Sequence, residues 1–314
     1  MPAWKILLTD GLADTGKAIL NKKNIAFDDQ NGIEPDALLA CIADYDALIV
    51  RGRTKVTKEV LSKASKLKVV GRCGVGVDNI DLEAAKEKGV IVVNAPVATT
   101  VAVAEHAMAL MLAMVREITK ADAGLKAGIW YKKEIKGSEL HGKTLGVIGF
   151  GHIGSTVGTY AKAFGMNVIA YDLVASVEQI KKYGGEPVTL DELYKRADVI
   201  TLHVPLTDST RHMINEQTIA KMKDGVRIIC AARGGVIDEI ALLQALESGK
   251  IAGAALDVFE KEPPQDSPLV KHPKLIATPH IGGETKEAQR RAAVDIVNEV
   301  LTALEGGPLH WRVA

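Results

Sequence analysis

The 314-residue chain has 47% hydrophobic and 25% charged residues, a composition typical of globular proteins, and is long enough for two domains. Its 39 basic residues balance its 39 acidic residues, which argues against binding to nucleic acid or to an anionic membrane surface. The longest apolar stretch, residues 107–115, is too short to span a bilayer, and the N-terminus lacks the layout of a signal or transit peptide. Three cysteines without metal-ligand spacing are typical of a reducing compartment, so we expect a cytoplasmic protein without a metal site.

Strand-like and helical segments alternate along the first hundred residues, and this order predicts a parallel sheet with helices packed on it. The expected strands are residues 5–9, 47–50, 69–72 and 91–94, and the helices between them include residues 15–21, 35–42 and 82–88. An apolar periodic pattern follows over residues 99–127 and predicts the longest helix of the chain. Two interpretations of this helix stay open, a core helix that joins two domains and a subunit interface.

A glycine motif follows, and its surroundings make it specific. Gly149, Gly151 and Gly154 form a GxGxxG pattern between an expected strand at 143–148 and an expected helix at 155–165. In such a motif the first glycine permits a tight turn, the second lets the backbone approach a pyrophosphate, and the third lets helix and strand pack closely. A second expected strand, residues 167–171, ends at Asp172, whose carboxylate would accept hydrogen bonds from a ribose diol and repel a 2′-phosphate. The motif therefore predicts an NAD site, against the alternative of a glycine turn without a ligand.

The alternation continues beyond the motif. Strands are expected at residues 187–189, 199–203, 226–230, 252–256 and 275–277, and helices at 191–196, 216–222 and 239–248. After Thr285 one amphipathic helix is expected to run to the end of the chain. Because the glycine motif lies in mid-chain, we expect an α/β fold of two Rossmann-like or flavodoxin-like domains with parallel sheets. Residues 99–284 would form the NAD-binding domain, inserted between residues 1–98 and 285–314 of the other.

Three polar residues follow expected strands, at the edge where open α/β sheets bind ligands: Arg233, Glu262 and His280. Each alone has an ordinary alternative: Arg233 as a surface ion-pair partner, Glu262 as a solvated acid, and His280 as the cap of a turn. Together they suit reduction of a 2-oxo acid, which needs a proton donor near the carbonyl and a cation for the carboxylate. Histidine supplies the proton, an adjacent carboxylate orients its ring, and the planar fork of arginine matches a carboxylate.

The chain resembles the D-2-hydroxyacid dehydrogenases over essentially its whole length, and most closely their D-3-phosphoglycerate dehydrogenase branch. The resemblance rests on the glycine motif and on four further segments, Val70-Gly71-Arg72-Cys73-Gly74-Val75-Gly76-Val77-Asp78-Asn79-Ile80-Asp81, Ala231-Ala232-Arg233-Gly234-Gly235-Val236-Ile237-Asp238, Gly253-Ala254-Ala255-Leu256-Asp257-Val258-Phe259 and Thr278-Pro279-His280. It implies two domains with a cleft between them, and a homodimer in which the helix at 100–117 helps the subunits clasp, with a tetramer as the alternative.

The resemblance also implies roles for individual residues. His280 would be the acid/base, Glu262 its paired carboxylate, and Arg233 the substrate anchor, while Asp257 would hold the nicotinamide carboxamide. The other implied cofactor contacts are Val75, His152, Ile153, His203, Val204, Pro205, Ala231, Ala232, Gly282 and Gly283, with Arg233 and His280. Backbone amides of Gly74, Val75 and Gly76 would bind the substrate carboxylate.

A basic cluster bears on which hydroxy acid is used. Arg51, Arg53 and Lys55 follow an expected strand, and such a cluster suits a phosphate-bearing substrate. Lys132 and Lys133 resemble a segment that approaches the neighbouring subunit's site in phosphoglycerate dehydrogenases. Solvated surface charge is the alternative for the three lysines, whereas the family often uses the position of Arg51 on the substrate.

The main hypothesis is NAD-dependent oxidation of D-3-phosphoglycerate to 3-phosphohydroxypyruvate, the entry to serine synthesis. Val204 stands where the branch often has Thr, and Gly283-Glu284 where Ala-Ser is commoner, so a glyoxylate or hydroxypyruvate reductase is the alternative. A formate dehydrogenase would need an amide in place of Glu262. From another class, the fold also serves an NAD-sensing corepressor. Because the sequence stops at Ala314, no C-terminal regulatory domain is expected.

Overall fold

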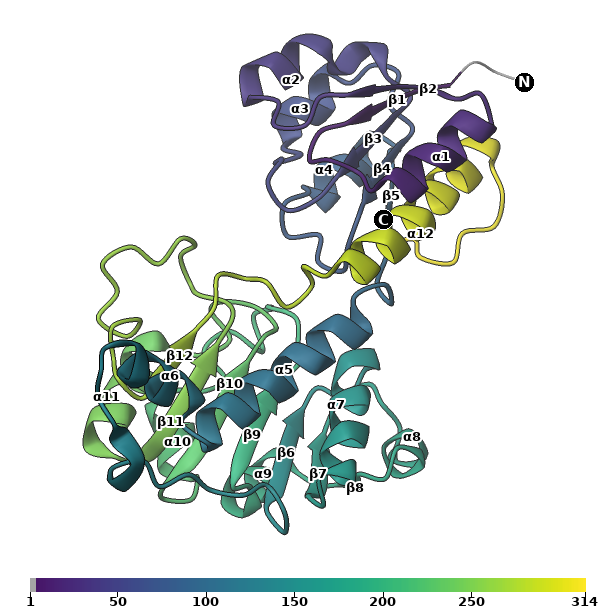
Figure 1. The fold of residues 1–314 in the computed structure, drawn as a ribbon. Coiled ribbons are helices and arrows are strands. Elements are labelled where there is room, and N and C mark those ends of the chain that lie inside the picture. The colour runs from purple at the N-terminus through teal and green to yellow at the C-terminus, as the bar shows by residue number, and fades with distance from the viewer. Residues whose placement is uncertain (1–3) are drawn as a thin grey trace. The chain divides into compact units, whose positions relative to one another are not determined.

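The computed structural model describes residues 4–314 (Figure 1); the first three residues of the N-terminal stretch discussed above lie outside the described residues. The chain divides into two compact units. We call Met1–Thr99 with Glu284–Ala314 the split unit, and Thr100–Gly283 the inserted unit. Each unit is built on its own parallel sheet, which confirms the predicted fold class.

The split unit contains a five-stranded sheet in the order β2-β1-β3-β4-β5, an order typical of flavodoxin-like folds. Its strands are β1 (Lys5–Leu8), β2 (Ala26–Asp29), β3 (Ala47–Val50), β4 (Val69–Arg72) and β5 (Ile91–Asn94). Its helices are α1 (Asp14–Lys22), α2 (Pro35–Cys41), α3 (Lys58–Lys63), α4 (Leu82–Glu87) and α12 (Lys286–Glu305), with a 3-10 turn at Ile42–Asp44. Two apolar clusters, one on each face of the sheet, form the core.

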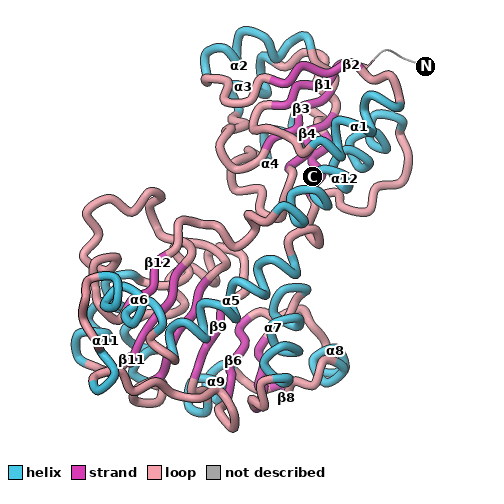
Figure 2. The backbone as a smooth tube through the Cα atoms, in the orientation of Figure 1, coloured by secondary structure: helices cyan, strands magenta, loops and turns pink. Residues whose placement is uncertain are grey.

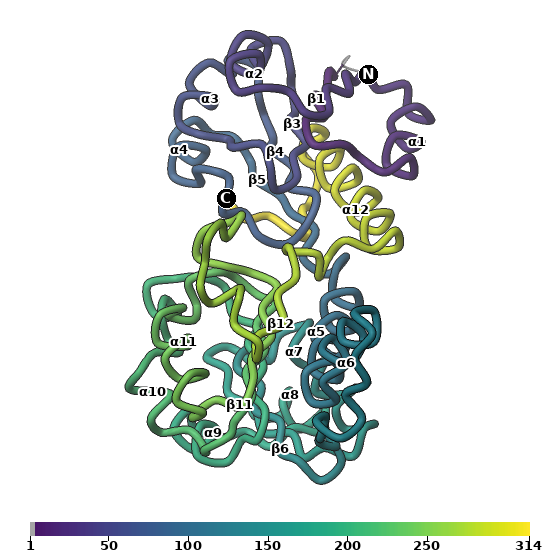
Figure 3. Tube along the Cα trace, turned by 60° about the vertical axis from the view of Figure 1, so that its left-hand side comes forward, coloured from purple at the N-terminus to yellow at the C-terminus, as the bar shows by residue number. Residues whose placement is uncertain are grey.

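Helix α12 completes the split unit although it is far from the other elements in sequence. It lies beside α1 and packs on β4 (Figures 1 and 3), where Gly71 leaves room for Ile296 and Val300. A Cβ at Gly71 would lie 2.5 Å from Val300 Cγ2, so a side chain there would push α12 off the sheet. This close packing ties the end of the chain to its first hundred residues.

The expectation that this helix reaches the end of the chain was wrong. It ends at Glu305, and its C-cap Gly306 has a φ of 72°, a left-handed conformation that favours glycine at a helix C-terminus. Gly307 and Pro308 follow and cannot easily continue a helix. The tail then returns to the sheet, where the Val313 N–H donates to Val92 O at 2.7 Å and Arg312 pairs antiparallel with Val93.

The inserted unit contains a seven-stranded parallel sheet in the order β12-β11-β10-β9-β6-β7-β8, visible as the strands of the lower part of Figure 2. The strands are β6 (Thr144–Ile148), β7 (Asn167–Tyr171), β8 (Glu186–Pro187), β9 (Val199–Leu202), β10 (Val226–Cys230), β11 (Ile251–Leu256) and β12 (Leu275–Ala277). The order reverses between β6 and β9, and doubly wound sheets bind dinucleotides at such a point.

Helices cover both faces of this sheet. The helices are α5 (Thr100–Val115), α6 (Ile118–Lys126), α7 (His152–Ala163), α8 (Val177–Lys182), α9 (Leu190–Arg196), α10 (Glu216–Ala220) and α11 (Glu239–Ser248), with a 3-10 turn at Tyr131–Lys133. Figure 3 shows α5 and α7 on one side of the strands and α9 to α11 on the other. Each side has its own apolar cluster, so the central strands are buried on both faces.

The helix predicted over residues 99–127 is two helices, and α12 is longer than either. Glu117 separates α5 from α6 with a φ of 52°, a left-handed conformation that no α-helix can contain. The apolar pattern continues across this break. The apolar residues of α5 are buried on most sides of the helix, whereas α6 leaves Ile118 and Leu125 exposed. None of the helices formed by residues 4–314 combines the length and apolar character needed to cross a bilayer.

Candidate active site

The glycine turn lies at the carboxyl end of β6, and its three glycines have different surroundings. Gly149 has a φ of 89°, and a Cβ there would lie 2.5 Å from His203 O. A Cβ at Gly154 would lie 2.0 Å from Gly149 O, so this glycine lets α7 pack on the turn. By contrast, a Cβ at Gly151 would meet no heavy atom within 4 Å. The first and third glycines are therefore needed for packing, and the second faces open space that a ligand can enter.

Helix α7 begins at His152, three residues before the expected start. Its N-cap is Gly151, which has no side chain to cap the helix. The N–H groups of a first helical turn have no intrahelical partners, and the helix dipole adds partial positive charge there. The turn thus offers backbone donors, around His152 and Ile153, beside open space at Gly151. These features fit the pyrophosphate of a dinucleotide.

Asp172 connects the glycine turn to the loop after β7. Its carboxylate accepts a hydrogen bond from the Phe150 N–H and two more from the N–H groups of Val174 and Ala175, at 2.7 and 2.8 Å. The side chain is therefore fixed at the end of β7, where a Rossmann fold places the acid that binds the adenosine ribose. The sequence predicted the position of this acid, but not its bond to the turn.

His203 follows β9 and lies against the glycine turn. Its Nε2 lies 2.9 Å from Thr201 Oγ1, while its buried Nδ1 has no hydrogen-bond partner within residues 4–314. Burial lowers the pKa of His203 to about 4, so the ring is neutral at pH 7. Val204 also lies against the glycine turn, because its Cγ1 would lie 2.9 Å from a Cβ at Gly149. A buried polar atom without a partner, such as His203 Nδ1, fits a segment whose missing partner is a bound cofactor.

His280 and Glu262 make a direct contact. Nδ1 of His280 lies 2.8 Å from Glu262 Oε2, and Glu262 Oε1 accepts a hydrogen bond from the Phe259 N–H at 3.1 Å. Because an ionised carboxylate only accepts hydrogen bonds, Nδ1 carries the hydrogen in this pair, and Nε2 takes no part in the contact. The imidazole is half exposed, as a group that exchanges protons with a substrate requires.

Arg233 lies in the loop after β10, while Glu262 and His280 follow β11 and β12. These three strands are neighbours in the sheet, so the structure brings all three residues to the edge that also carries the glycine turn. The turn after Arg233 is tight, because a Cβ at Gly234 would lie 1.8 Å from Phe259 O. Ala231 and Ala232 lead into this turn, and Ala232 O accepts a hydrogen bond from Arg233 Nη1 at 2.6 Å.

Asp257 holds the loop around His280 from within the protein. Its side chain is 1% exposed, and its carboxylate accepts hydrogen bonds from the N–H groups of Ile281 and Gly282 at 2.9 and 2.8 Å. Thr278 Oγ1 donates to the same carboxylate at 2.6 Å. These bonds lie on both sides of His280 in the sequence, so Asp257 fixes the backbone that carries the imidazole. The predicted contact of Asp257 with a carboxamide stays a prediction.

Sequence reasoning missed His106 in this network. Its Nε2 lies 3.3 Å from Asp257 Oδ1 and 3.1 Å from Thr278 Oγ1. Burial by itself would raise the pKa of Asp257, but the hydrogen bonds from His106, Thr278 and the two backbone N–H groups outweigh it and lower that pKa. A signal was present, because His106 and Glu105 are the only residues with ionisable side chains in the apolar sequence of α5.

In the split unit, the two predicted arginines are held differently. Arg51 forms an ion pair with Glu284, and its backbone N–H donates to Asp10 Oδ2 at 2.7 Å. Arg53 donates from Nη2 to Ile33 O at 2.8 Å, and its Nε lies 3.5 Å from Asp10 Oδ1. Lys55 is exposed.

The predicted anion loop at Gly74, Val75 and Gly76 follows β4. The Gly74 N–H already donates to Arg72 O at 2.8 Å, and Gly74 has a φ of 144° that favours glycine. Asn94 Nδ2 donates to Val75 O at 2.7 Å and so holds the loop from its carbonyl side. This leaves the N–H groups of Val75 and Gly76 as the predicted donors to an anion.

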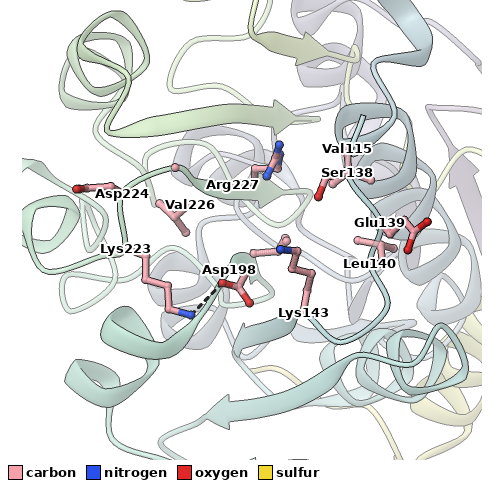
Figure 4. A pocket seen from close by; sticks show the side chains of 12 residues that line it. Val115, Ser138, Glu139, Leu140, Lys143, Asp198, Lys223, Asp224, Val226 and Arg227 are labelled. Atoms are coloured by element: carbon pink, nitrogen blue, oxygen red, sulfur yellow. Dashed lines mark hydrogen bonds and ion pairs between the residues drawn. The ribbon is translucent and has the colours of Figure 1, made fainter. Parts of the chain in front are cut away.

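A polar pocket lies at the opposite edge of the inserted unit's sheet, where β6, β9 and β10 begin (Figure 4). Asp198 accepts hydrogen bonds there from the Thr144 N–H at 2.8 Å and from Lys223 Nζ at 2.9 Å. None of the predicted site residues lines this pocket. Within the described residues, no group of three or more His, Cys, Asp and Glu side chains could hold a metal ion.

Known proteins are similar to this chain in sequence and in fold. The chain is 53% identical over 303 residues to a D-3-phosphoglycerate dehydrogenase of Methanocaldococcus jannaschii, covering 96% of this chain but only 58% of that relative. It is 47% identical to a hydroxypyruvate reductase of Thermotoga maritima, covering 97% of this chain and 99% of that one. A glyoxylate reductase from Paecilomyes thermophila has a similar structure, with a TM-score of 0.89, 35% identity, and coverage of 100% and 99%.

A family model described as "D-isomer specific 2-hydroxyacid dehydrogenase, NAD binding domain" matches residues 108–282. This range contains the glycine turn, Asp172, Arg233, Glu262 and His280. The predicted cofactor, NAD, is thereby confirmed. The chain belongs to the family of D-isomer specific 2-hydroxyacid dehydrogenases.

Proposed function

We propose that this chain transfers a hydride between NAD and a D-2-hydroxy acid, and that its preferred reaction is oxidation of D-3-phosphoglycerate to 3-phosphohydroxypyruvate. The contact between His280 and Glu262, at the sheet edge that carries the glycine turn, is the observation on which the proposal rests. The 53% identical relative named for this substrate supports the finer assignment. In this proposal the inserted unit binds NAD and the split unit supplies substrate contacts.

The site residues divide the chemistry among them. In the oxidation, His280 Nε2 accepts the proton of the substrate hydroxyl, and Glu262 stabilises the imidazolium that forms. Arg233 holds the substrate carboxylate and, in the reverse direction, polarises the carbonyl oxygen. The N–H groups of Val75 and Gly76 contribute donors to the carboxylate. When bound, NAD accepts the hydride that leaves C2.

Arg51 is proposed to bind the phosphate of the substrate. A guanidinium offers paired N–H donors that match a phosphate, and Arg51 is held in place through its backbone by Asp10 and Asn79. Arg53 makes its contacts with Ile33 and Asp10 and is proposed as a weaker contributor.

A glyoxylate or hydroxypyruvate reductase is the second candidate, and one observation favours it. Glu284 already pairs with Arg51, which reduces the positive charge available to a phosphate. The hydroxypyruvate reductase of Thermotoga maritima also matches this chain over nearly the whole length of both proteins.

Steady-state NAD reduction with D-3-phosphoglycerate and with D-glycerate distinguishes the candidates. We expect kcat/KM to favour the phosphorylated substrate by roughly 10²-fold, and this margin to collapse in Arg51→Ala. Lys58→Ala is the matched control, because it removes one positive charge of the same unit from an exposed ion pair with Glu87. Equal rates with both substrates, or a preference for D-glycerate, would favour the reductase. NAD binding without turnover of either would favour a binding protein.

We further propose that the chain forms a homodimer. Large apolar side chains are exposed close together in sequence at Ile118, Leu125, Ile129 and Trp130, and such patches commonly mark interfaces. Sedimentation of the wild type and of Trp130→Ser tests this, with a shift towards the monomer expected in the variant.

A further inference from the structure

The ion pair between Arg51 and Glu284 joins two well-held residues of the split unit. The loop of Arg51 is fixed by two backbone contacts, from its own N–H to Asp10 and from Asn79 Nδ2 to its carbonyl oxygen at 2.9 Å. Glu284 pairs with Arg51 through Oε1, and its Oε2 accepts a hydrogen bond from Gln289 Nε2 at 2.6 Å. Glu284 also directly precedes Thr285, the N-cap of α12. Gln289 of α12 thus holds the Glu284 carboxylate beside the guanidinium.

Charged side chains of both signs surround this pair. Arg72 and Asp295 lie, with Arg51 and Glu284, within electrostatic reach of the buried Cys73, and Asp10 and Arg53 lie at the loop of Arg51. Removing the Glu284 charge would make the surroundings of Arg51 more positive by one charge, which favours an incoming phosphate.

We propose that Glu284 is a specificity-determining residue, which competes with the substrate phosphate for Arg51 and limits the preference for phosphorylated D-2-hydroxy acids. The inference rests on the proposed function, in which Arg51 binds that phosphate. A phosphate monoester carries a charge of about −1.5 to −2 at pH 7, and its oxygens suit the same guanidinium fork as a carboxylate. A bound phosphate must displace Glu284 or lie beside it, and both oppose binding. A substrate without phosphate meets neither cost.

The competition is moderate, because the side chains of Arg51 and Glu284 are 30% and 44% exposed. Water and salt screen such pairs, so the carboxylate can be displaced. This is how a chain can keep an arginine suited to phosphate and still accept smaller hydroxy acids. The effect is expected to weaken as ionic strength rises.

The test compares Glu284→Gln with the wild type. The amide keeps the size and hydrogen-bonding capacity of the side chain but removes its charge. We expect the ratio of kcat/KM for D-3-phosphoglycerate to that for D-glycerate to rise about tenfold at low salt, and less at high salt. Glu287→Gln is the matched control, because Glu287 lies three residues further along in the first turn of α12 and loses the same charge. An unchanged ratio in Glu284→Gln, or an equal rise in Glu287→Gln, would overturn the proposal.

A double-mutant cycle assigns the effect to the pair. In the Arg51→Ala background, Glu284→Gln should change the ratio by less than about twofold, because no guanidinium is left to release. A full effect in that background would show that Glu284 acts without Arg51, against the proposal.

A second readout separates this inference from the proposed function. Inorganic phosphate binding is measured by calorimetry on the intact protein, without turnover. Glu284→Gln should bind phosphate about tenfold more tightly than the wild type, with no change in Glu287→Gln. If the wild type oxidises neither substrate, the proposed function fails, yet tighter phosphate binding would still support the competition. Equal phosphate affinity in the two proteins would overturn it.

Discussion

His280 and Glu262 belong to separate loops, yet Nδ1 of the imidazole lies 2.8 Å from Oε2 of the carboxylate. The Phe259 N–H holds the other carboxylate oxygen at 3.1 Å, so the orientation of the ring is fixed through Glu262 by the backbone of the loop after β11. The pair is built into the fold, and it gives the most direct tests of the proposed chemistry.

Replacing His280 with Gln should lower kcat by at least about 10²-fold, because an amide cannot take up the proton that general acid–base catalysis requires. Steady-state NAD reduction measures the effect. The matched control is His272→Gln, which changes a partly exposed histidine of the same unit whose ring accepts a hydrogen bond from the Lys274 N–H. Near-normal turnover in His280→Gln would remove this residue from the proposed mechanism.

Two variants of Glu262 separate orientation from charge. In Glu262→Gln the amide oxygen can still accept the hydrogen bond from Nδ1, whereas Glu262→Ala loses both the acceptor and the charge. We expect kcat to fall in both variants, and further in the alanine variant by about tenfold, the value of one hydrogen bond of roughly 1–1.5 kcal/mol. Equal losses of kcat in the two variants would show that only the charge of Glu262 matters.

Asp172→Ala should narrow the preference for NAD over NADP, because the variant no longer binds the ribose diol or repels a 2′-phosphate. The ratio of kcat/KM for the two cofactors measures it. The same change removes the acceptor for the Phe150, Val174 and Ala175 N–H groups, so some stability should also be lost. Lower stability with an unchanged cofactor ratio would make Asp172 a structural residue only.

The glycines of the turn offer a matched pair of substitutions. Gly151→Ala places its Cβ in open space, so the free energy of unfolding should fall by no more than about 1 kcal/mol, the cost of alanine at an N-cap, while the affinity for NAD falls. Gly154→Ala places its Cβ 2.0 Å from Gly149 O, and overpacking of this kind costs about 1–3 kcal/mol. Denaturant unfolding and NAD titration measure the two effects. A Gly151→Ala variant that is destabilised as much as Gly154→Ala, or that binds NAD as well as the wild type, would contradict the assignment of that space to a ligand.

His203 should make stability depend on pH. Its pKa is about 4 when folded, against a usual value of 6.5, so protons bind the unfolded chain more readily between these values. The contribution of His203 to stability is therefore fully present above pH 6.5 and is lost as the pH falls towards 4. The linkage relation gives a loss of about 2 kcal/mol between pH 7 and pH 5. Denaturant unfolding at the two pH values measures it, and His203→Gln should lack this part of the loss.

Much of the fold could be predicted because its central strands are short apolar runs between turn residues. β3, β4 and β10 lie where the pattern put them. β2 was missed because its sequence, Ala-Phe-Asp-Asp, is that of a half-exposed edge strand with little apolar signal. The break at Glu117 was missed because a change of backbone conformation need not interrupt an apolar pattern.

Some residues of the candidate site could likewise be predicted from the sequence, and others could not. Arg233, Glu262 and His280 could be named because they follow strands, and the edge of a parallel sheet brings such residues together. The partner of Arg51 could not be found in this way, since Glu284 lies more than two hundred residues away and meets it only through the packing of α12. His106 stood out in the apolar sequence of α5, but its contact could not be predicted, because it depends on Asp257, a buried acid that follows β11.

The packing of α12 against Gly71 has a consequence for how the protein is made. Translation delivers the five strands of the split unit first, but the helix that covers β4 emerges only after residue 286. The part of that sheet that α12 covers, on β3, β4 and β5, must therefore wait for this helix while the ribosome synthesises Thr100–Gly283. The inserted unit has all of its strands by residue 277 and can finish folding before its host does. The part of the protein that begins first is completed last.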